Sequence, residues 1–236
     1  MHCLHISLIE EYTDMSKATA LASAQIKHVL KVCNLMTHSE GKRCALVLSH
    51  AAMRVSEVAR LQTKTVLYPS GAIREEINLP AAICKALKPR TIWLTNKLTR
   101  QIIQEWIDYR IKRRWGTMPN DDSYQTLNPE SKLLFNNRGR PYALTEKTRV
   151  LIDGSVKSYR ASDALEHSIR DIYKKAGLHN ASSHSGRKSM VTNSIIKQGR
   201  TLEQMARILG HDDIQTTLDY VDISRERLIE MCLSLS

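Results

Sequence analysis

The sequence predicts a mainly helical α+β domain, and three observations support this prediction. Apolar residues recur every three or four positions over most of the 236-residue chain, a spacing typical of amphipathic helices. Residues 71–94 break that pattern with two short β-prone segments bounded by glycine and proline. The hydrophobic content of 42% suffices for one sizeable core. We therefore expect helices around one core, with a small antiparallel β-sheet or hairpin at one edge.

The first half of the chain supplies two core helices, the sheet and a long helix. Helical spacing of apolar residues is found over 20–34 and again near 44–48, in the segment that leads to Arg54. The short segments 72–79 and 91–94 are the expected strands. A further helix is expected after Thr95, which is a suitable N-cap, and this helix ends in a basic run.

The middle of the chain is less regular. Residues 116–131 are polar and rich in turn-forming residues, which indicates a surface loop. Residues 133–135 resemble a short buried strand, whereas 145–160 form a basic insert that the pattern leaves unassigned and that we expect to be mobile. Ser162 is a candidate cap for the next helix, and Gly177 follows the end of that helix.

The C-terminal third begins with a well-marked helix over 202–209. Thr201 and Gln204 form a capping-box pattern at its start, and Gly210 provides a stop at its end. This assignment places His211 immediately after the end of a helix, where its side chain is available to a site.

A second C-terminal helix is expected to carry Tyr220. Ile214, Leu218 and Val221 continue the helical spacing of apolar residues, and Tyr220 lies off that stripe. We therefore expect the tyrosine to face away from the core, where it is presented to a ligand. The tail beyond it also has helical spacing, over 225–235. This tail either packs on its own domain or docks on a neighbouring copy.

The charge and cysteine content narrow the class of protein. Lysine plus arginine exceed aspartate plus glutamate by 35 − 24 = 11, which favours a polyanionic partner. No apolar run reaches the roughly 20 residues of a membrane-spanning helix, and the N-terminus lacks the features of a signal peptide. The five cysteines include no Cys-x-x-Cys pair, which argues against a disulfide framework and a zinc site. We expect an intracellular protein without membrane contact.

Several chemistry-bearing residues stand in a suggestive order. They are Arg54 with Glu57, then His184-Ser-Gly-Arg187, then Leu-Gly-His211, and then Tyr220. Arginine offers a permanently charged planar fork for two phosphate oxygens, and a tyrosine oxygen forms a covalent intermediate once its proton is removed. This set indicates attack on a phosphate ester without a metal, and therefore DNA strand cleavage.

In that order and spacing the residues resemble the catalytic domain of tyrosine recombinases, the phage integrase family, over about residues 20–236. Residues 1–19 are then an N-terminal extension. The run Lys85-Ala-Leu-Lys88-Pro-Arg90 is similar to the β-hairpin of that family which carries a catalytic lysine, and Lys85 matches the lysine position better than Lys88. The resemblance implies the recombinase catalytic-domain fold, in a short form that lacks most of the N-terminal DNA-binding domain.

The resemblance also implies a role for each residue. Tyr220 is the nucleophile that forms a 3′-phosphotyrosine bond, so that strands are cleaved and rejoined without ATP, metal or other cofactor. Arg54 and Arg187 hold the phosphate, and Glu57 orients Arg54. Lys85 is the general acid for the leaving 5′-oxygen. The roles of the histidines are left open: His184 accepts the tyrosine proton, or His211 donates to a phosphate oxygen.

The implied partner is double-stranded DNA that carries specific recombination sites. The resemblance implies a tetramer on DNA, a monomer or weak oligomer free of it, accessory DNA-bending proteins in some systems, and a cytoplasmic, nucleoid-associated location. Contact with DNA is expected from the basic hairpin and the basic helix after it, through Lys88, Arg90, Lys97, Arg100, Arg110, Lys112, Arg113 and Arg114.

One departure from the family pattern concerns packing. Gly186 stands where the family usually has leucine, and Lys188 where histidine is common. We expect looser packing at the start of the helix that carries Arg187.

Two other functions stay open on the sequence alone. Segments 202–209 and 213–222 have the dimensions of a helix-turn-helix, which would suit a non-catalytic DNA-binding regulator. A type IB topoisomerase would use nearly the same chemistry to relax supercoils without paired specific sites. Each residue could also have a purely structural role, such as a surface ion pair between Arg54 and Glu57 or hydrogen-bonded structural histidines at 184 and 211.

Overall fold

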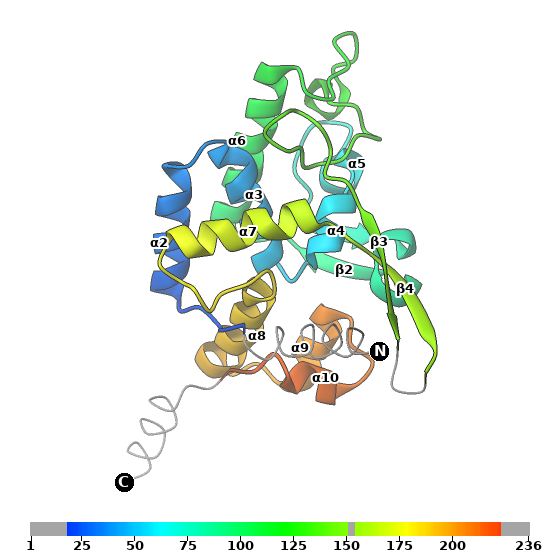
Figure 1. Cartoon of the computed structure of the whole chain (residues 1–236). Coiled ribbons are helices and arrows are strands. Elements are labelled where there is room, and N and C mark those ends of the chain that lie inside the picture. The colour runs from blue at the N-terminus through cyan, green and yellow to red at the C-terminus, as the bar shows by residue number, and fades with distance from the viewer. Residues whose placement is uncertain (1–17, 151–153, 223–236) are drawn as a thin grey trace, which may run out of the picture.

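The computed structural model describes residues 18–150 and 154–222 (Figure 1). The expected α+β fold, mainly helical with small antiparallel sheets, is confirmed. The helices are α2 (Ser23–Asn34), α3 (Ser39–His50), α4 (Val55–Arg60), α5 (Thr63–Val66), α6 (Lys97–Arg113), α7 (Asp163–Lys175), α8 (Ser185–Gln198), α9 (Leu202–Leu209) and α10 (Ile214–Leu218). The strands are β1 (Glu76–Leu79), β2 (Arg90–Trp93), β3 (Thr145–Val150) and β4 (Val156–Ala161).

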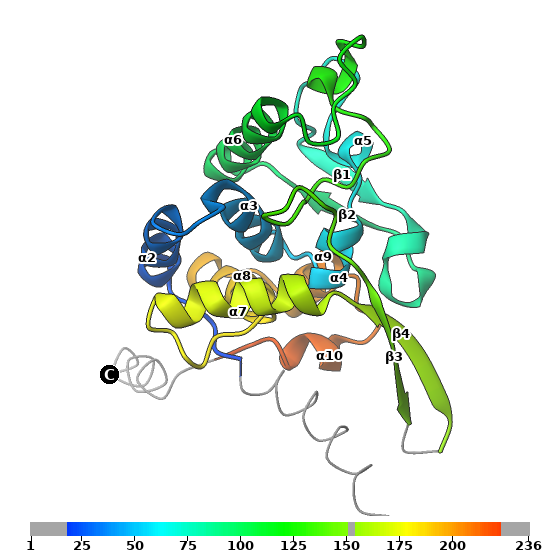
Figure 2. The ribbon, with the colours of Figure 1, turned by 45° about the horizontal axis from the view of Figure 1, so that its top comes forward.

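Helix α3 lies at the centre of the core. Its consecutive residues Cys44 to Leu48 are all buried, because α2, α6, α7 and α8 pack around it (Figures 1 and 2). Trp106 of α6 and Tyr173 of α7 are the largest aromatic side chains that these neighbours bury completely. The apolar spacing near residues 44–48 therefore predicted the helix on which the others are arranged.

Strands β1 and β2 form the predicted sheet at one edge. They pair antiparallel, with Glu76 opposite Trp93 and Leu79 opposite Arg90. Strand β1 begins later than the predicted residue 72, because Ile73 instead pairs with the segment after α5. Two short 3₁₀ turns connect the strands, and the second of them, Lys85–Leu87, begins at Lys85.

The described part of the basic insert, which the sequence pattern left unassigned, is a second antiparallel ribbon formed by β3 and β4. It projects beyond the helical body beside α4 (Figures 1 and 2). Polar residues occupy both faces of these strands, and most of the described positions are exposed. Because no face is apolar, the alternation that marks a half-buried strand is missing from the sequence.

Helix ends were predicted with mixed success. Thr201 caps α9 as predicted, and Gly210 ends it in a left-handed conformation, with φ of 66°. Thr95 is not the cap of α6, because the side chain of Asn96 accepts the hydrogen bond from the backbone N–H of Thr99. Ser162 precedes α7 as predicted, but its hydroxyl makes no capping hydrogen bond.

The expectation of loose packing at the start of α8 is wrong. Gly186 and Lys188 are both buried, and α8 packs closely on the end of α3. A Cβ atom added at Gly186 would lie 2.6 Å from the hydroxyl oxygen of Ser49 and 2.9 Å from its carbonyl carbon. Glycine therefore allows the two backbones to approach, and a leucine would not fit.

We predict that Gly186→Ala destabilises the protein by about 1–3 kcal/mol, because the added methyl group collides with the backbone of α3. Chemical denaturation measures this change in the free energy of unfolding. Lys197→Ala, at an exposed position of the same helix, is the matched control. A Gly186→Ala protein as stable as the control would contradict the close approach.

The prediction that Arg110 contacts DNA is wrong. Its side chain is fully buried, and it donates hydrogen bonds to Thr63 Oγ1, Ser131 Oγ and the carbonyl oxygen of Leu133. The guanidinium carbon also lies 4.5 Å from the ring centre of Phe135. Helical periodicity explains the error, since Arg110 falls on the same inward face as Ile103, Trp106 and Ile107.

Two predictions fall outside the described residues: the extension over most of 1–19 and the docking of the tail at 225–235. Their boundaries therefore stay predictions. Within residues 18–150 and 154–222, every helix is too short or too polar to cross a lipid bilayer.

Candidate active site

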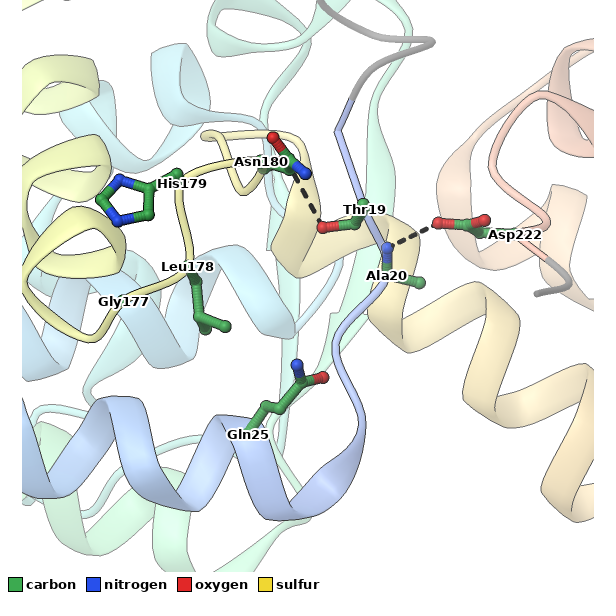
Figure 3. Close-up of a pocket in the computed structure, with 8 residues that line it drawn as sticks. All are labelled: Thr19, Ala20, Gln25, Gly177, Leu178, His179, Asn180 and Asp222. Carbon is green, nitrogen blue, oxygen red and sulfur yellow. Dashed lines mark hydrogen bonds between the residues drawn. The ribbon is translucent and has the colours of Figure 1, made fainter. Parts of the chain in front are cut away.

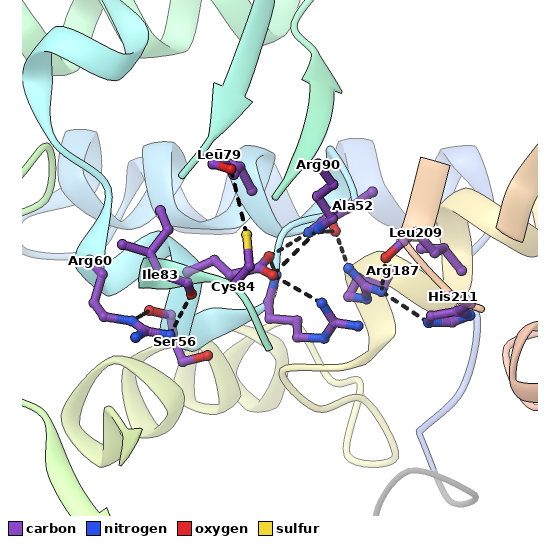
Figure 4. A network of polar contacts seen from close by, with 12 residues as sticks. Ala52, Ser56, Arg60, Leu79, Ile83, Cys84, Arg90, Arg187, Leu209 and His211 are labelled. Atoms are coloured by element: carbon purple, nitrogen blue, oxygen red, sulfur yellow. Dashed lines mark hydrogen bonds and ion pairs between the residues drawn. The ribbon is translucent and has the colours of Figure 1, made fainter. Parts of the chain in front are cut away.

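Five segments far apart in the sequence meet below the centre of the molecule. They are the start of α4, the connection between β1 and β2, the start of α8, the end of α9 and the residues after α10 (Figure 2). Each contributes at least one of the residues that the sequence singled out, and Figure 4 shows polar contacts among the first four of these segments.

Glu57 is the buried carboxylate that organises the arginines. Its Oε1 accepts a hydrogen bond from Arg54 Nη1 at 2.9 Å, and its Oε2 accepts one from the backbone N–H of Arg54 at 2.7 Å. Arg90 donates to both carboxylate oxygens. The side chain of Glu57 is fully buried, and although burial alone would raise its pKa, Arg90, Arg187 and Arg54 together lower it. The predicted contact between Arg54 and Glu57 is present.

Ala52 presents its carbonyl oxygen to two arginines. This oxygen accepts a hydrogen bond from Arg90 Nη2 at 2.9 Å and another from Arg187 Nη1 (Figure 4). Ala52 is fully buried and has a φ of 69°, a conformation that costs an L-residue roughly 1 kcal/mol. The strained backbone thus brings two guanidinium groups together.

Arg187 is buried and incompletely paired. Besides Ala52, it contacts the carbonyl oxygen of Leu209 at 3.5 Å and His211 Nε2 at 3.4 Å. Its Nε, which is also buried, has no hydrogen-bond partner among the described residues. Burial lowers the pKa of Arg187 to about 10, so the group is still charged at neutral pH. A buried N–H without an acceptor is costly, and a phosphate oxygen would satisfy it.

His211 is held in one tautomer. Because arginine has no acceptor, His211 Nε2 must accept from Arg187, and Nδ1 then carries the proton that it donates to Thr217 Oγ1 at 3.0 Å. The pKa of His211 is lowered to about 3, first by burial and then by the nearby charges of Arg187, Arg54, Arg90 and Lys85. The imidazole is therefore neutral before any anion enters the site.

Two partly buried histidines make stability depend on pH. Burial also lowers the pKa of His50, to about 4. In the unfolded chain both His50 and His211 take up protons below pH 6.5, whereas in the folded protein they stay neutral until about pH 4 and 3. The unfolded state binds more protons in this window, so acid favours unfolding.

We therefore predict that the thermal midpoint falls as the pH is lowered from about 6.5 towards 4. Calorimetry across this range measures the slope. In His50→Gln, which keeps a polar side chain beside Tyr173 but cannot be protonated, the slope should be smaller. An unchanged slope in that variant would show that His50 is not the titrating group.

Tyr220 is buried, contrary to the prediction that it faces away from the core. Its exposed fraction is 5%, and its ring centre lies 5.2 Å from that of His211 and 5.4 Å from the guanidinium carbon of Arg187. The prediction failed because α10 ends at Leu218, so the helical stripe does not extend to residue 220. Thr192 Oγ1 donates to the carbonyl oxygen of Tyr220 at 3.0 Å and fixes this segment.

The remaining predicted catalytic residues lie at the margin of this cluster. Lys85 is exposed, and its charge contributes to the lowered pKa of His211. Lys88 forms an exposed ion pair with Asp212 at 2.6 Å, which joins the same connection to the segment after α9. His184 lies at the N-terminal end of α8, one turn before Arg187.

The predicted DNA-contacting residues are not all available at this surface. The prediction that Arg90 contacts DNA is also wrong, because its side chain is only 5% exposed and donates hydrogen bonds to oxygen atoms of the protein. Arg100 pairs with Glu75. Lys97 is exposed at the start of α6, whereas the exposed run 112–114 lies at its other end, away from α9 and α10 (Figure 1).

The sequence analysis missed Ala52, Thr192 and Thr217, all of which hold site residues through hydrogen bonds. No local signal marks the strained Ala52, since alanine does not favour its conformation. Burial of a threonine six positions after His211 is equally invisible in the sequence pattern.

A pocket lies outside this cluster, between the segment before α2 and the turn after α7 (Figure 3). Asp222 there accepts a hydrogen bond from the backbone N–H of Ala20 at 2.8 Å. The chain entering α2 is thereby attached to the segment that follows Tyr220.

Comparisons with known proteins place this fold and its arginine-rich site in one family. The model of the phage integrase family matches residues 19–227. The chain belongs to that family. No curated protein sequence matches it.

Solved structures share the fold at low identity. The crystal structure of XerA recombinase is 20% identical with a TM-score of 0.63, and the match covers 92% of this chain and 64% of that one. XerH recombinase in a post-cleavage complex with a difH substrate is 20% identical with a TM-score of 0.61, and the match covers 90% of this chain and 51% of that one. The Tn1549 transposon integrase in complex with transposon right end DNA is 17% identical with a TM-score of 0.57, and the match covers 92% of this chain and 66% of that one. The chain thus spans less than two thirds of each.

Proposed function

We propose that this chain is the catalytic domain of a site-specific DNA recombinase that cleaves and rejoins strands through a 3′-phosphotyrosine intermediate. The observation that carries the proposal is that Arg187 and His211 lie beside the ring of Tyr220, with Arg54 and Lys85 near enough to lower the pKa of His211, in a chain of the phage integrase family. The structural neighbours XerH and Tn1549 integrase were solved on DNA substrates, which supports DNA as the polyanionic partner.

In the proposed reaction the phenolic oxygen of Tyr220 attacks one backbone phosphorus. The bond between phosphorus and the 5′-oxygen breaks, and Lys85 gives a proton to that oxygen. The products are a 3′-phosphotyrosine and a free 5′-hydroxyl. Attack by a 5′-hydroxyl on this ester, with the proton returned, rejoins the strand, so the energy of the ester bond is conserved.

Arg54 and Arg187 would hold the non-bridging phosphate oxygens. The unpaired Nε of Arg187 and the partly exposed fork of Arg54 both have donors to offer. An anion would also counter the positive field around His211, raise its pKa and allow it to donate to the phosphate, the role we propose for it. We propose His184 as the acceptor of the tyrosine proton.

The non-catalytic regulator is less well supported. Helix α10 has only five residues, which is short for a recognition helix in a DNA groove. Thr217, at its centre, is buried against His211. A regulator would also have no use for a buried tyrosine between an arginine and a histidine.

The test uses a nicked suicide duplex drawn from DNA flanking the gene, from which the short cleaved fragment diffuses away. The full chain should accumulate a DNA adduct that survives denaturing detergent. Supercoiled plasmid without a cognate site should stay largely unrelaxed, whereas a type IB topoisomerase would relax it. The absence of any adduct on the authentic site would refute the proposal.

We further propose assembly as a tetramer on paired recombination sites, from a free monomer or weak oligomer, with accessory DNA-bending proteins in the full reaction. The location that fits this activity is the cytoplasm, in association with the nucleoid.

A further inference from the structure

The connection that carries Lys85 is held by arginine on both sides. This connection spans residues 80–89, between β1 and β2. Cys84 is buried in the hydrophobic core and Ile83 packs against that core, but Lys85, Leu87, Lys88 and Pro89 are all exposed. A general acid must nevertheless lie within hydrogen-bond reach of the leaving oxygen. The core anchors the turn only up to Cys84, so polar contacts must hold the exposed part that carries Lys85.

Arg90, the first residue of β2, links the end of the connection to two other parts of the site. Besides Glu57 and Ala52 at the start of α4, its Nη1 donates to the carbonyl oxygen of Ile208, near the end of α9, at 3.1 Å. The aliphatic stem of Arg90 packs against Gly210, where an added Cβ would lie 2.7 Å from Arg90 Cδ. One side chain thus joins the turn of Lys85 to the segments of Arg54 and His211.

Arg60 holds the end of the connection that follows β1. It lies at the end of α4, its Nε donates to the carbonyl oxygen of Ser56, and its two Nη groups donate to the carbonyl oxygens of Ala82 and Ile83 (Figure 4). These two carbonyls belong to the 3₁₀ turn that immediately precedes Cys84 and Lys85. Helix α4 therefore holds both ends of the connection, through Arg60 directly and through Glu57 by way of Arg90.

We propose that Arg90 and Arg60 are positioning residues for Lys85, which set the distance between the general acid and the phosphate held by Arg54 and Arg187. The planar guanidinium is needed because the oxygens that each of these side chains bonds are spread around its three nitrogen atoms, whereas the three N–H groups of a lysine ammonium all lie on one nitrogen. This inference rests on the proposed function, because it takes Lys85 as the general acid.

The experiment replaces the bridging 5′-oxygen at the cleavage site with sulfur. A thiolate leaves without a proton, since a thiol has a pKa of about 8.5, whereas the alkoxide from the normal substrate requires the general acid. Single-turnover cleavage of both duplexes is measured for the wild type, Arg90→Lys and Arg60→Lys. Because the two duplexes are compared on the same protein preparation, any misfolded fraction cancels in the ratio of rates.

Both variants should cleave the normal duplex about 10- to 100-fold more slowly than the wild type, and the sulfur duplex at nearly the wild-type rate. Arg138→Lys, which changes an exposed arginine in the turn after residues 133–135, should leave both rates unchanged. Equal losses on both duplexes, or unchanged rates on both, would overturn the inference. Lys85→Ala separates the two proposals: if sulfur fails to rescue that variant, the assignment of Lys85 as the general acid is wrong.

Discussion

Replacing Tyr220 with phenylalanine is expected to abolish covalent attachment to DNA and to leave binding of the same duplex nearly unchanged. Phenylalanine retains the ring that packs beside His211 and Arg187, so the variant removes the hydroxyl and little else. Without the phenolic oxygen no phosphotyrosine can form. Denaturing gel electrophoresis of the suicide duplex measures the adduct, and a mobility-shift titration measures binding.

Tyr68→Phe is the matched control for this variant. Tyr68 is exposed and its ring lies under Arg74, so loss of its hydroxyl should not affect cleavage. If Tyr220→Phe still formed a detergent-resistant adduct, the nucleophile would have to be another residue, and the proposed chemistry at this site would be wrong.

Arg187→Lys should slow cleavage by about 10²- to 10³-fold, the usual effect of losing one donor to a developing oxyanion. Lysine keeps the charge, but its ammonium cannot bond the carbonyl of Ala52 and contact His211 while also offering an N–H to phosphate. Single-turnover rates at saturating protein report the chemical step, so weaker DNA binding does not enter the comparison.

The unfolding midpoint of Arg187→Lys must be measured alongside, because the side chain is buried. Arg138→Lys again serves as the control, since it is the same exchange at an exposed position. A fully folded Arg187→Lys protein that cleaved at the wild-type rate would show that the planar guanidinium is not required.

The sequence predicted the elements with strong apolar periodicity and the set of residues that meets at the site. Helices α2, α3, α6, α7 and α9 each carry a stripe of buried apolar residues, which is visible without a structure. The order of Arg54, Arg187, His211 and Tyr220 was likewise readable, because a family motif preserves spacing.

What the sequence could not provide depends on contacts between distant segments. In the sequence, Arg90 and Arg110 cannot be distinguished from exposed arginines. In the structure both donate hydrogen bonds to carbonyl oxygens of other segments. The burial of Tyr220 follows from the early end of α10 and from Thr192 on another helix. Such features arise from tertiary packing, for which local periodicity carries no information.

The enclosure of Tyr220 has a consequence for the protein before it meets DNA. A phenol that is 5% exposed and fixed through its own backbone is shielded from reagents in solution. Tyrosine-selective nitration or iodination should therefore spare residue 220 in the free protein and modify exposed Tyr68 first. If Tyr220 is the nucleophile, as we propose, the same enclosure would keep a phosphodiester at the protein surface away from the phenol until the residues around Tyr220 move.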